Sequence, residues 1–168
     1  ACVDNGIPAV MSYPVGAMGR TCSFMPGGPY ASECFSMPYR APYEKLKVFM
    51  EDADNRRILY YYRHIGGWTK EWFEDFCTGE KTHPQISTIV WLTGTLAAME
   101  VIKIITGRWK PVAAPYYWYF TPDSCKIKKF TWARRMLSRL VARDWGKMII
   151  PFIAARPNLV RFFTKLIS

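Results

Sequence analysis

The sequence predicts an α/β fold in which short strands pair beside one long apolar helix. The 168 residues are enough to bury one core, and a composition of 50% hydrophobic and 21% charged residues lies outside the disordered and low-complexity classes. An apolar run over residues 86–106 has helical length, and strand-like runs bounded by Gly and Pro precede and follow it.

Two strands are predicted near the N-terminus. Residues 1–6 have the pattern of a last helical turn that ends at Gly6, and the absence of an initiator Met suggests a truncated chain. Ile7 to Tyr13 is apolar on both faces, as in a buried strand, and residues 16–19 turn the chain. Arg20 to Met25 alternates polar and apolar side chains, which predicts a second strand with one solvated face.

Residues 30–85 are predicted to be an irregular connection with short helices, because prolines and a polar run interrupt every period. Aromatic residues at helical i, i+4, i+5, i+8 spacing predict one amphipathic helix there: Trp68, Trp72, Phe73 and Phe76. Two interpretations stay open. The aromatic face packs onto its own core, or it forms a lid or a partner groove.

The clearest helix is Ile86 to Thr106. Its polar residues share one narrow strip and apolar residues cover the rest, so we expect extensive burial. Glu100 and Lys103 stand at i, i+3 and can support each other, and Gly107 is placed to end the helix in the left-handed conformation. The longest uncharged stretch, Pro84 to Met99, has 16 residues against the roughly 20 of a bilayer span, so no transmembrane helix is predicted.

An antiparallel hairpin and a basic tail are predicted after this helix. Residues 115–121 and 125–132 form the hairpin strands, with lysines that mark a sheet edge. Helices are expected at Ala133 to Arg143 and at Leu159 to Ile167. Residues 1–100 hold 9 basic and 11 acidic side chains, whereas residues 101–168 hold 14 and 2. Three readings of the tail, residues 133–168, stay open: helices that cover the sheet, an anionic membrane surface as partner, and nucleic acid, which the residues favour least.

The cysteines indicate a reducing compartment. There are five, an odd number, without a C-x-x-C pair, and no signal sequence precedes them. We therefore expect free thiols and a cytoplasmic location, with peripheral membrane binding through the tail as an addition.

Two separated segments resemble one family. The run from Ala1 to Val10, the turn at 16–19, the strand at Thr21 to Phe24 and the Pro26 to Pro29 turn look like the middle of the ThiF/MoeB/HesA family, relatives of the ubiquitin-activating enzymes. Residues 94–107 are similar to that family's late helix, G-x-x-x-A-x-E-x-x-K-x-x-x-G. The resemblance covers about residues 1–29 and 84–121.

The resemblance implies a partial Rossmann-like domain over residues 1–132, with a mixed sheet and the second half of an adenylyltransferase. Such an enzyme uses ATP and Mg²⁺ to adenylate the C-terminal carboxylate of a ubiquitin-like or sulfur-carrier protein. Its phosphate loop would lie upstream of Ala1, because neither G-x-G-x-x-G nor G-x-x-x-x-G-K-[ST] occurs here, so no cofactor is expected in this chain. A homo-oligomer, or a missing N-terminal half supplied by another chain, stays open as partner.

Two family features depart from the pattern. The zinc-binding C-x-x-C pairs are incomplete. Ala31 occupies the position of the first cysteine in the pair that would include Cys34, and Cys125 has no second cysteine beside it, so no zinc is predicted. Cys77 is the one candidate for the family's catalytic or sulfur-relaying cysteine, with Lys81 and His83 near it in sequence to lower its pKa, although its spacing is about three residues off. The competing interpretation is a partly buried, unreactive thiol.

A second class of function is kept beside this one. The chain is then a non-catalytic interaction module that uses its basic tail, the edge of its sheet or the Trp68 to Phe76 face.

Overall fold

The computed structural model describes residues 2–35, 37–53, 55–56, 69–82 and 85–133, and the single positions Met136, Arg156, Asn158 and Leu159. The protein is mixed α/β, as the sequence predicts. Its contacts form two units, residues 1–31 with 83–130 and residues 32–82 with 131–168, and every strand described belongs to the first.

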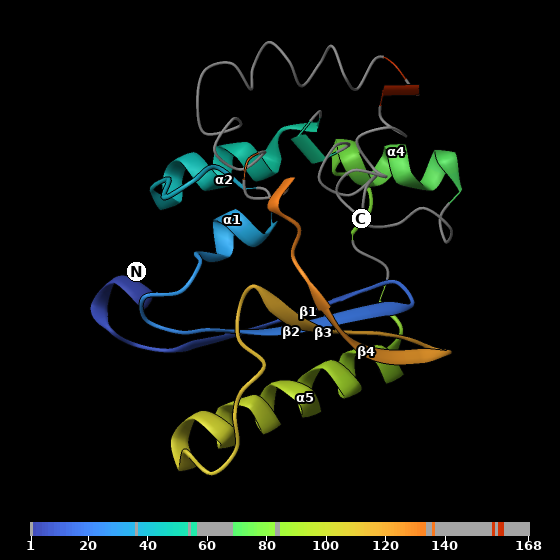
Figure 1. Ribbon diagram of the computed structural model, residues 1–168. Helices are drawn as coiled ribbons and strands as arrows, with labels where there is room; N and C mark the ends of the chain where they lie inside the picture. The colour runs from blue at the N-terminus through green and yellow to red at the C-terminus, as the bar shows by residue number, and fades with distance from the viewer. Residues whose placement is uncertain are drawn as a thin grey trace. The chain divides into compact units, whose positions relative to one another are not determined.

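The sheet of the first unit has four strands in the order β1-β2-β3-β4. They are β1 (Ala9–Val15), β2 (Met18–Phe24), β3 (Tyr116–Thr121) and β4 (Ser124–Lys129). The prediction of a mixed sheet is wrong for these strands, because each runs antiparallel to its neighbours (Figure 1). Two-residue turns reverse the chain within each hairpin, and β3 enters beside β2 in the opposite direction.

Two glycines set the geometry of the first hairpin. Gly16 begins the turn between β1 and β2 with a φ of 54°, the left-handed conformation that short hairpin turns favour at this position. Gly19 lies on β2 directly beneath Phe120, and a Cβ there would overlap that ring and come within 2.7 Å of Thr93 Oγ1. The close approach therefore requires glycine.

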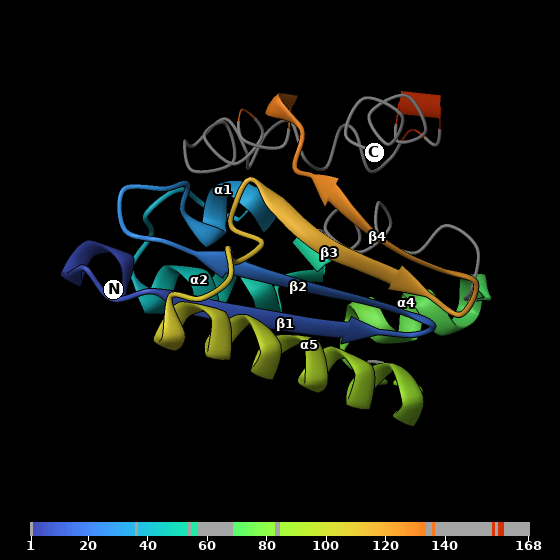
Figure 2. The same ribbon diagram turned by 60° about the horizontal axis from the view of Figure 1, so that its bottom comes forward.

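Helix α5 (Ser87–Thr106) lies along one face of the sheet, against β1 and β2 (Figure 2). It ends at Gly107, whose φ of 62° and N–H bond to the Lys103 carbonyl confirm the predicted stop. The prediction of extensive burial is wrong, because only Ile89, Thr93 and Glu100 of this helix are buried. One face is held by the sheet, and the other is apolar and exposed.

The antiparallel hairpin predicted after the long helix is confirmed, and its strands are β3 and β4. Trp118 pairs with Ile127, and β4 is an edge strand with Lys126, Lys128 and Lys129. Near the N-terminus, a 3₁₀ turn η1 (Val3–Asn5) ends at Gly6, whose φ is 72°.

The second unit contributes α2 (Tyr43–Glu51), α4 (Lys70–Thr78) and all of α1 (Ala31–Phe35) but its first residue. Thr69 caps the start of α4, because its side chain accepts a hydrogen bond from Trp72 N at 3.2 Å, and Gly79 caps the end with a φ of 90°. Trp72 and Phe76 stack with ring centroids 6.0 Å apart, and Phe76 is buried. This favours core packing for the aromatic face. Trp68 and nearly all of the predicted tail helices lie outside the described residues.

Candidate functional site

The centre of the first unit is a buried carboxylate on an otherwise apolar helix. Glu100 is 0% exposed, and its two oxygens accept four hydrogen bonds. Oε1 accepts from Lys103 Nζ at 2.6 Å and from Trp118 Nε1 of β3 at 2.8 Å. Oε2 accepts from the Val112 N–H at 2.7 Å and from Ser23 Oγ of β2 at 3.3 Å. One side chain thus joins α5 to two strands and to the loop before β3.

The surroundings of Glu100 hold it as an anion. Burial by itself raises the pKa of the carboxyl, but hydrogen bonds from Lys103, Trp118 and Val112, together with the positive charge of Lys103, outweigh burial and leave the pKa lowered. A fully bonded, low-pKa carboxylate without solvent access is a poor proton acceptor. The geometry therefore assigns Glu100 to fastening the helix.

A second polar link lies about two turns toward the start of α5. The Thr93 carbonyl accepts hydrogen bonds from Ser12 Oγ of β1 at 3.3 Å and from Thr21 Oγ1 of β2 at 3.5 Å, and the two hydroxyls lie 3.0 Å apart. We call these two links together the α5–sheet seam. Thr93 and Glu100 of α5 therefore face the sheet, whereas Thr88, Thr95 and Thr106 are exposed.

The opposite side of α5 is apolar and open to solvent. We call it the outer face of α5, and its side chains are 40% to 79% exposed: Trp91, Leu92, Met99, Val101, Ile102 and Ile105. By length and composition, α5 is a helix that could cross a membrane, with a mean hydropathy of 1.6 and 17% of the stretch buried. The seam shows what the sequence pattern does not, namely that this helix is bonded to a sheet through the Thr93 carbonyl and the Glu100 carboxylate.

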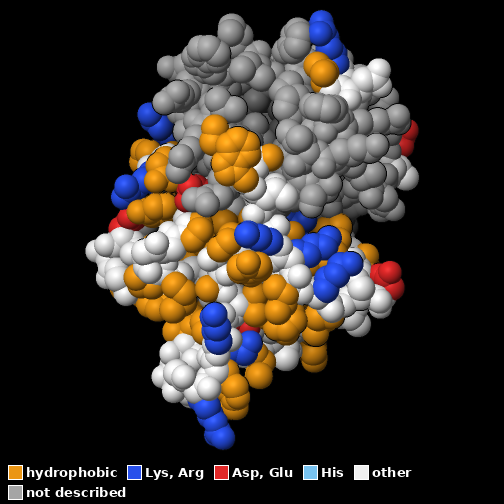
Figure 3. Space-filling model, viewed as in Figure 1, with side chains coloured by type: hydrophobic (Ala, Val, Ile, Leu, Met, Phe, Trp, Pro, Cys, Tyr) orange, Lys and Arg blue, Asp and Glu red, His pale blue; other side chains and the backbone are white. Residues whose placement is uncertain are grey.

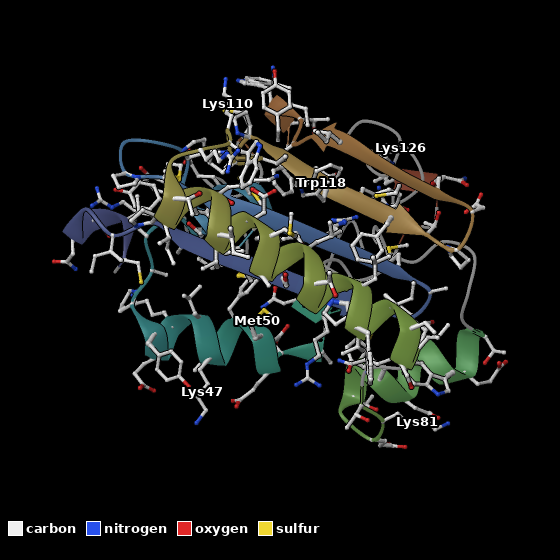
Figure 4. The ribbon with its side chains drawn as sticks, turned by 90° about the horizontal axis from the view of Figure 1, so that it is seen from below. Lys47, Met50, Lys81, Lys110, Trp118 and Lys126 are labelled. Carbon is white, nitrogen blue, oxygen red and sulfur yellow. The ribbon has the colours of Figure 1, made fainter. Side chains whose placement is uncertain are left out.

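Three basic residues of this unit lie beside that face, namely Arg108, Lys110 and Lys129, whereas Arg20 and Lys128 lie over the ring of Tyr119 on the other face of the sheet. Arg108 follows α5 and stacks on Trp109 at 5.0 Å, and Lys110 comes next. Seen from the α5 side, Lys110 lies at the loop that leaves the helix, and Trp118 lies beside the helix on β3 (Figure 4). Lys129 of β4 lies over the ring of Tyr116 at 5.4 Å.

The structure places Cys77, the predicted catalytic candidate, on α4 with 1% of its surface exposed. Lys81, expected to lower its pKa, forms an ion pair with Asp75 at 2.6 Å, and His83 lies outside the described residues. Reactive thiols are partly exposed, so the burial favours the interpretation of Cys77 as a structural thiol.

All five cysteines of the chain are free thiols. Cys34 is buried and Cys125 is exposed. Among the described residues, no three His, Cys, Asp or Glu side chains come together as metal ligands.

The sequence predicts the Glu100–Lys103 pair but not its setting. Spacing alone indicates a local helix contact, whereas in the structure Glu100 also bonds two strands. The available signal was that Glu100 is the only acidic residue in a 20-residue apolar helix. Such a charge is costly to bury and is kept only with partners.

Comparison with known proteins does not assign the chain. No protein family matches its sequence, and no curated protein matches it either.

Proposed function

We propose that the chain forms the sheet-and-helix part of a ThiF/MoeB/HesA-type adenylyltransferase, an enzyme that activates the C-terminus of a ubiquitin-like or sulfur-carrier protein. One observation supports this above others. The two segments that resemble the family, about residues 1–29 and 84–121, lie in the same structural unit. They are joined by the hydrogen bond from Ser23 of the first segment to Glu100 of the second.

The late-helix pattern has a physical reason at three of its positions. Glu100 binds the sheet, Lys103 neutralises Glu100, and Gly107 ends the helix with a positive φ. Gly94 has no such reason within this chain, since a Cβ there would meet nothing within 4 Å. Two of the five fixed positions, Glu100 and Lys103, thus serve to attach this helix to this sheet.

In this proposal the domain is partly Rossmann-like, and the chain supplies scaffold and carrier-protein surface. ATP and Mg²⁺ are held by a glycine-rich loop at a helix N-terminus, a motif that the 168 residues do not contain. Adenylation then requires the residues encoded next to this segment or a second chain.

The test extends the chain upstream of Ala1 along its coding sequence and measures ATP–pyrophosphate exchange with candidate carrier proteins. We expect exchange that depends on the carrier for the extended protein and none for the 168 residues alone. Tight ATP binding by the 168-residue chain, or an upstream sequence without a strand and glycine-rich turn, contradicts the proposal.

A second candidate function is a non-catalytic interaction module, and the outer face of α5 favours it. An exposed apolar surface of this extent is uncommon on monomeric proteins and marks contact sites. It adds to the surfaces that the sequence suggests, the sheet edge and the residues around Phe76. The basic tail, residues 133–168, lies almost wholly outside the described residues and stays a prediction.

A further inference from the structure

We infer that the outer face of α5, with the cations around its C-terminal end, is a docking surface for an anionic lipid membrane. This inference rests on the second candidate function and is independent of the resemblance to activating enzymes. Vesicle binding and pyrophosphate exchange can therefore fail separately.

The outer face of α5 exposes a large apolar area. Trp91 is 79% exposed and Ile105 is 77% exposed, and four further apolar side chains, at least 40% exposed, spread over about half of the helix circumference. Together these side chains expose roughly 600 Å² of apolar area, at the upper end of the largest patch found on typical monomers. Helix α5 is about 30 Å long, so the patch has the shape of a helix lying flat in an interface.

Two of the three exposed threonines on this side, Thr95 and Thr106, bond their hydroxyls within the helix. Thr95 Oγ1 donates to the Trp91 carbonyl at 3.0 Å, and Thr106 Oγ1 donates to the Ile102 carbonyl at 2.7 Å. These bonds within the helix satisfy hydroxyls that would otherwise lose water on entering an apolar phase. The structure describes all of α5, and its two charged side chains, Glu100 and Lys103, bond each other in the seam. The outer face can thus enter lipid without burying a charge.

Positive charge beside the outer face of α5 selects an anionic partner. Arg108 and Lys110 are exposed directly after α5, and Trp109 between them is 52% exposed. Trp flanked by cations is the arrangement that anchors helices at membrane surfaces. Figure 3 shows Lys and Arg side chains among hydrophobic ones over the lower part of the view, where Figure 1 places the sheet and α5.

The β4 edge extends the same surface. Alternation along the strand puts Ile127 and Lys129 on the sheet face that α5 covers, since their partners there are Trp118 and Tyr116. Ile127 and Lys129 are exposed. The apolar helix and this strand therefore share one side of the sheet.

Acidic residues are scarce in this unit. Residues 1–31 and 83–130 contain Asp4, Glu100 and Asp123. Glu100 is buried, Asp4 accepts a hydrogen bond from Tyr30, and Asp123 lies in the turn between β3 and β4. If two copies of the chain met through the outer face of α5, this face would supply no carboxylate to pair with the cations beside it. Anionic lipid headgroups would pair with these cations.

The experiment is sedimentation of the full 168-residue chain with vesicles of phosphatidylcholine, with and without phosphatidylserine, over a range of salt concentrations. We expect binding that requires phosphatidylserine and weakens with salt. The double variant W91S/I105S should bind at least tenfold more weakly. R108Q/K110Q should lose about fivefold for each cation removed.

Controls separate this surface from the rest of the chain. Val48 on α2 is an apolar side chain that is 68% exposed, so Val48→Ser should bind vesicles like the wild type. Because Trp91 and Ile105 are exposed, their double variant should keep the wild-type Tm, which shows that lost binding is not unfolding. Both double variants keep the basic tail.

Three results overturn the inference. The first is absence of binding by the wild-type chain, and the second is undiminished binding by W91S/I105S. The third is a wild-type dimer in solution that W91S/I105S converts to monomer without any lipid binding in either protein, because the face then belongs to a second copy.

Discussion

Replacing Glu100 by Gln probes the link that fixes α5 on the sheet. The amide has nearly the same shape, but it is neutral and one of its two ends donates. If the NH₂ takes the place of Oε1, it faces the donors Lys103 and Trp118. If it takes the place of Oε2, Ser23 can rotate and accept, and only the Val112 N–H is left facing a donor. The second orientation is therefore the less costly one.

The magnitude follows from that orientation. An unpaired buried N–H costs about 1–3 kcal/mol. Lys103, whose side chain is 16% exposed, also loses its anion, and breaking a buried pair by removing one partner typically costs about 3–5 kcal/mol. The two costs arise at one site and overlap, so we take the value for the broken pair as the total: a loss of about 3–5 kcal/mol in the free energy of unfolding, a large part of the roughly 5–15 kcal/mol that folded domains possess.

The assay is urea denaturation followed by far-UV circular dichroism. With a urea dependence near 2 kcal/mol per molar, the midpoint should fall by about 2 M. Glu44→Gln, at an exposed position on α2, is the matched control and should change stability by no more than about 0.5 kcal/mol. A Glu100→Gln midpoint within about 0.5 M of the wild type would refute the role given to this carboxylate.

Three further predictions concern the same structure. Gly19→Ala places a Cβ into the Phe120 ring and should destabilise the protein by about 1–3 kcal/mol. Gly94→Ala, in open space on a helix, should stabilise it by about 0.5–1 kcal/mol. Equal urea midpoints for the two variants would contradict the packing described. Because the pKa of Glu100 is lowered in the folded protein, the unfolded chain takes up a proton at this residue first as pH falls. The stability that Glu100 contributes is therefore complete above the ordinary Glu pKa of about 4.5 and is lost as pH falls below that value through the folded-state pKa. The free energy of unfolding measured against pH should show this loss in the wild type and less of it in Glu100→Gln. Under native conditions a maleimide should label exposed Cys125 rapidly and buried Cys77 slowly, as mass spectrometry of peptides can measure, and equal rates would restore Cys77 as a reactive candidate.

Local patterns predicted where the elements of the first unit lie along the chain, but the solvated face predicted for the second strand is wrong, because β2 is buried at six of its seven residues. The apolar run that stops at Gly107 gave α5 within a residue of its observed start, and the alternation around Pro122 predicted the hairpin of β3 and β4. Both signals are local, because a left-handed glycine or a proline turn acts on the residues next to it. Strand direction across the sheet was not local information, and the mixed sheet was predicted wrongly.

The sequence by itself determined that residues 87–106 are a helix and that this helix carries a single acid. Only the tertiary structure decided which way the helix faces. When nearly every position is apolar, periodicity does not choose a buried side, and the choice falls to the polar groups that cannot be left without partners. Ser23 and Trp118, far from Glu100 in the chain, satisfy that carboxylate, and in doing so they turn Trp91 and Ile105 toward solvent.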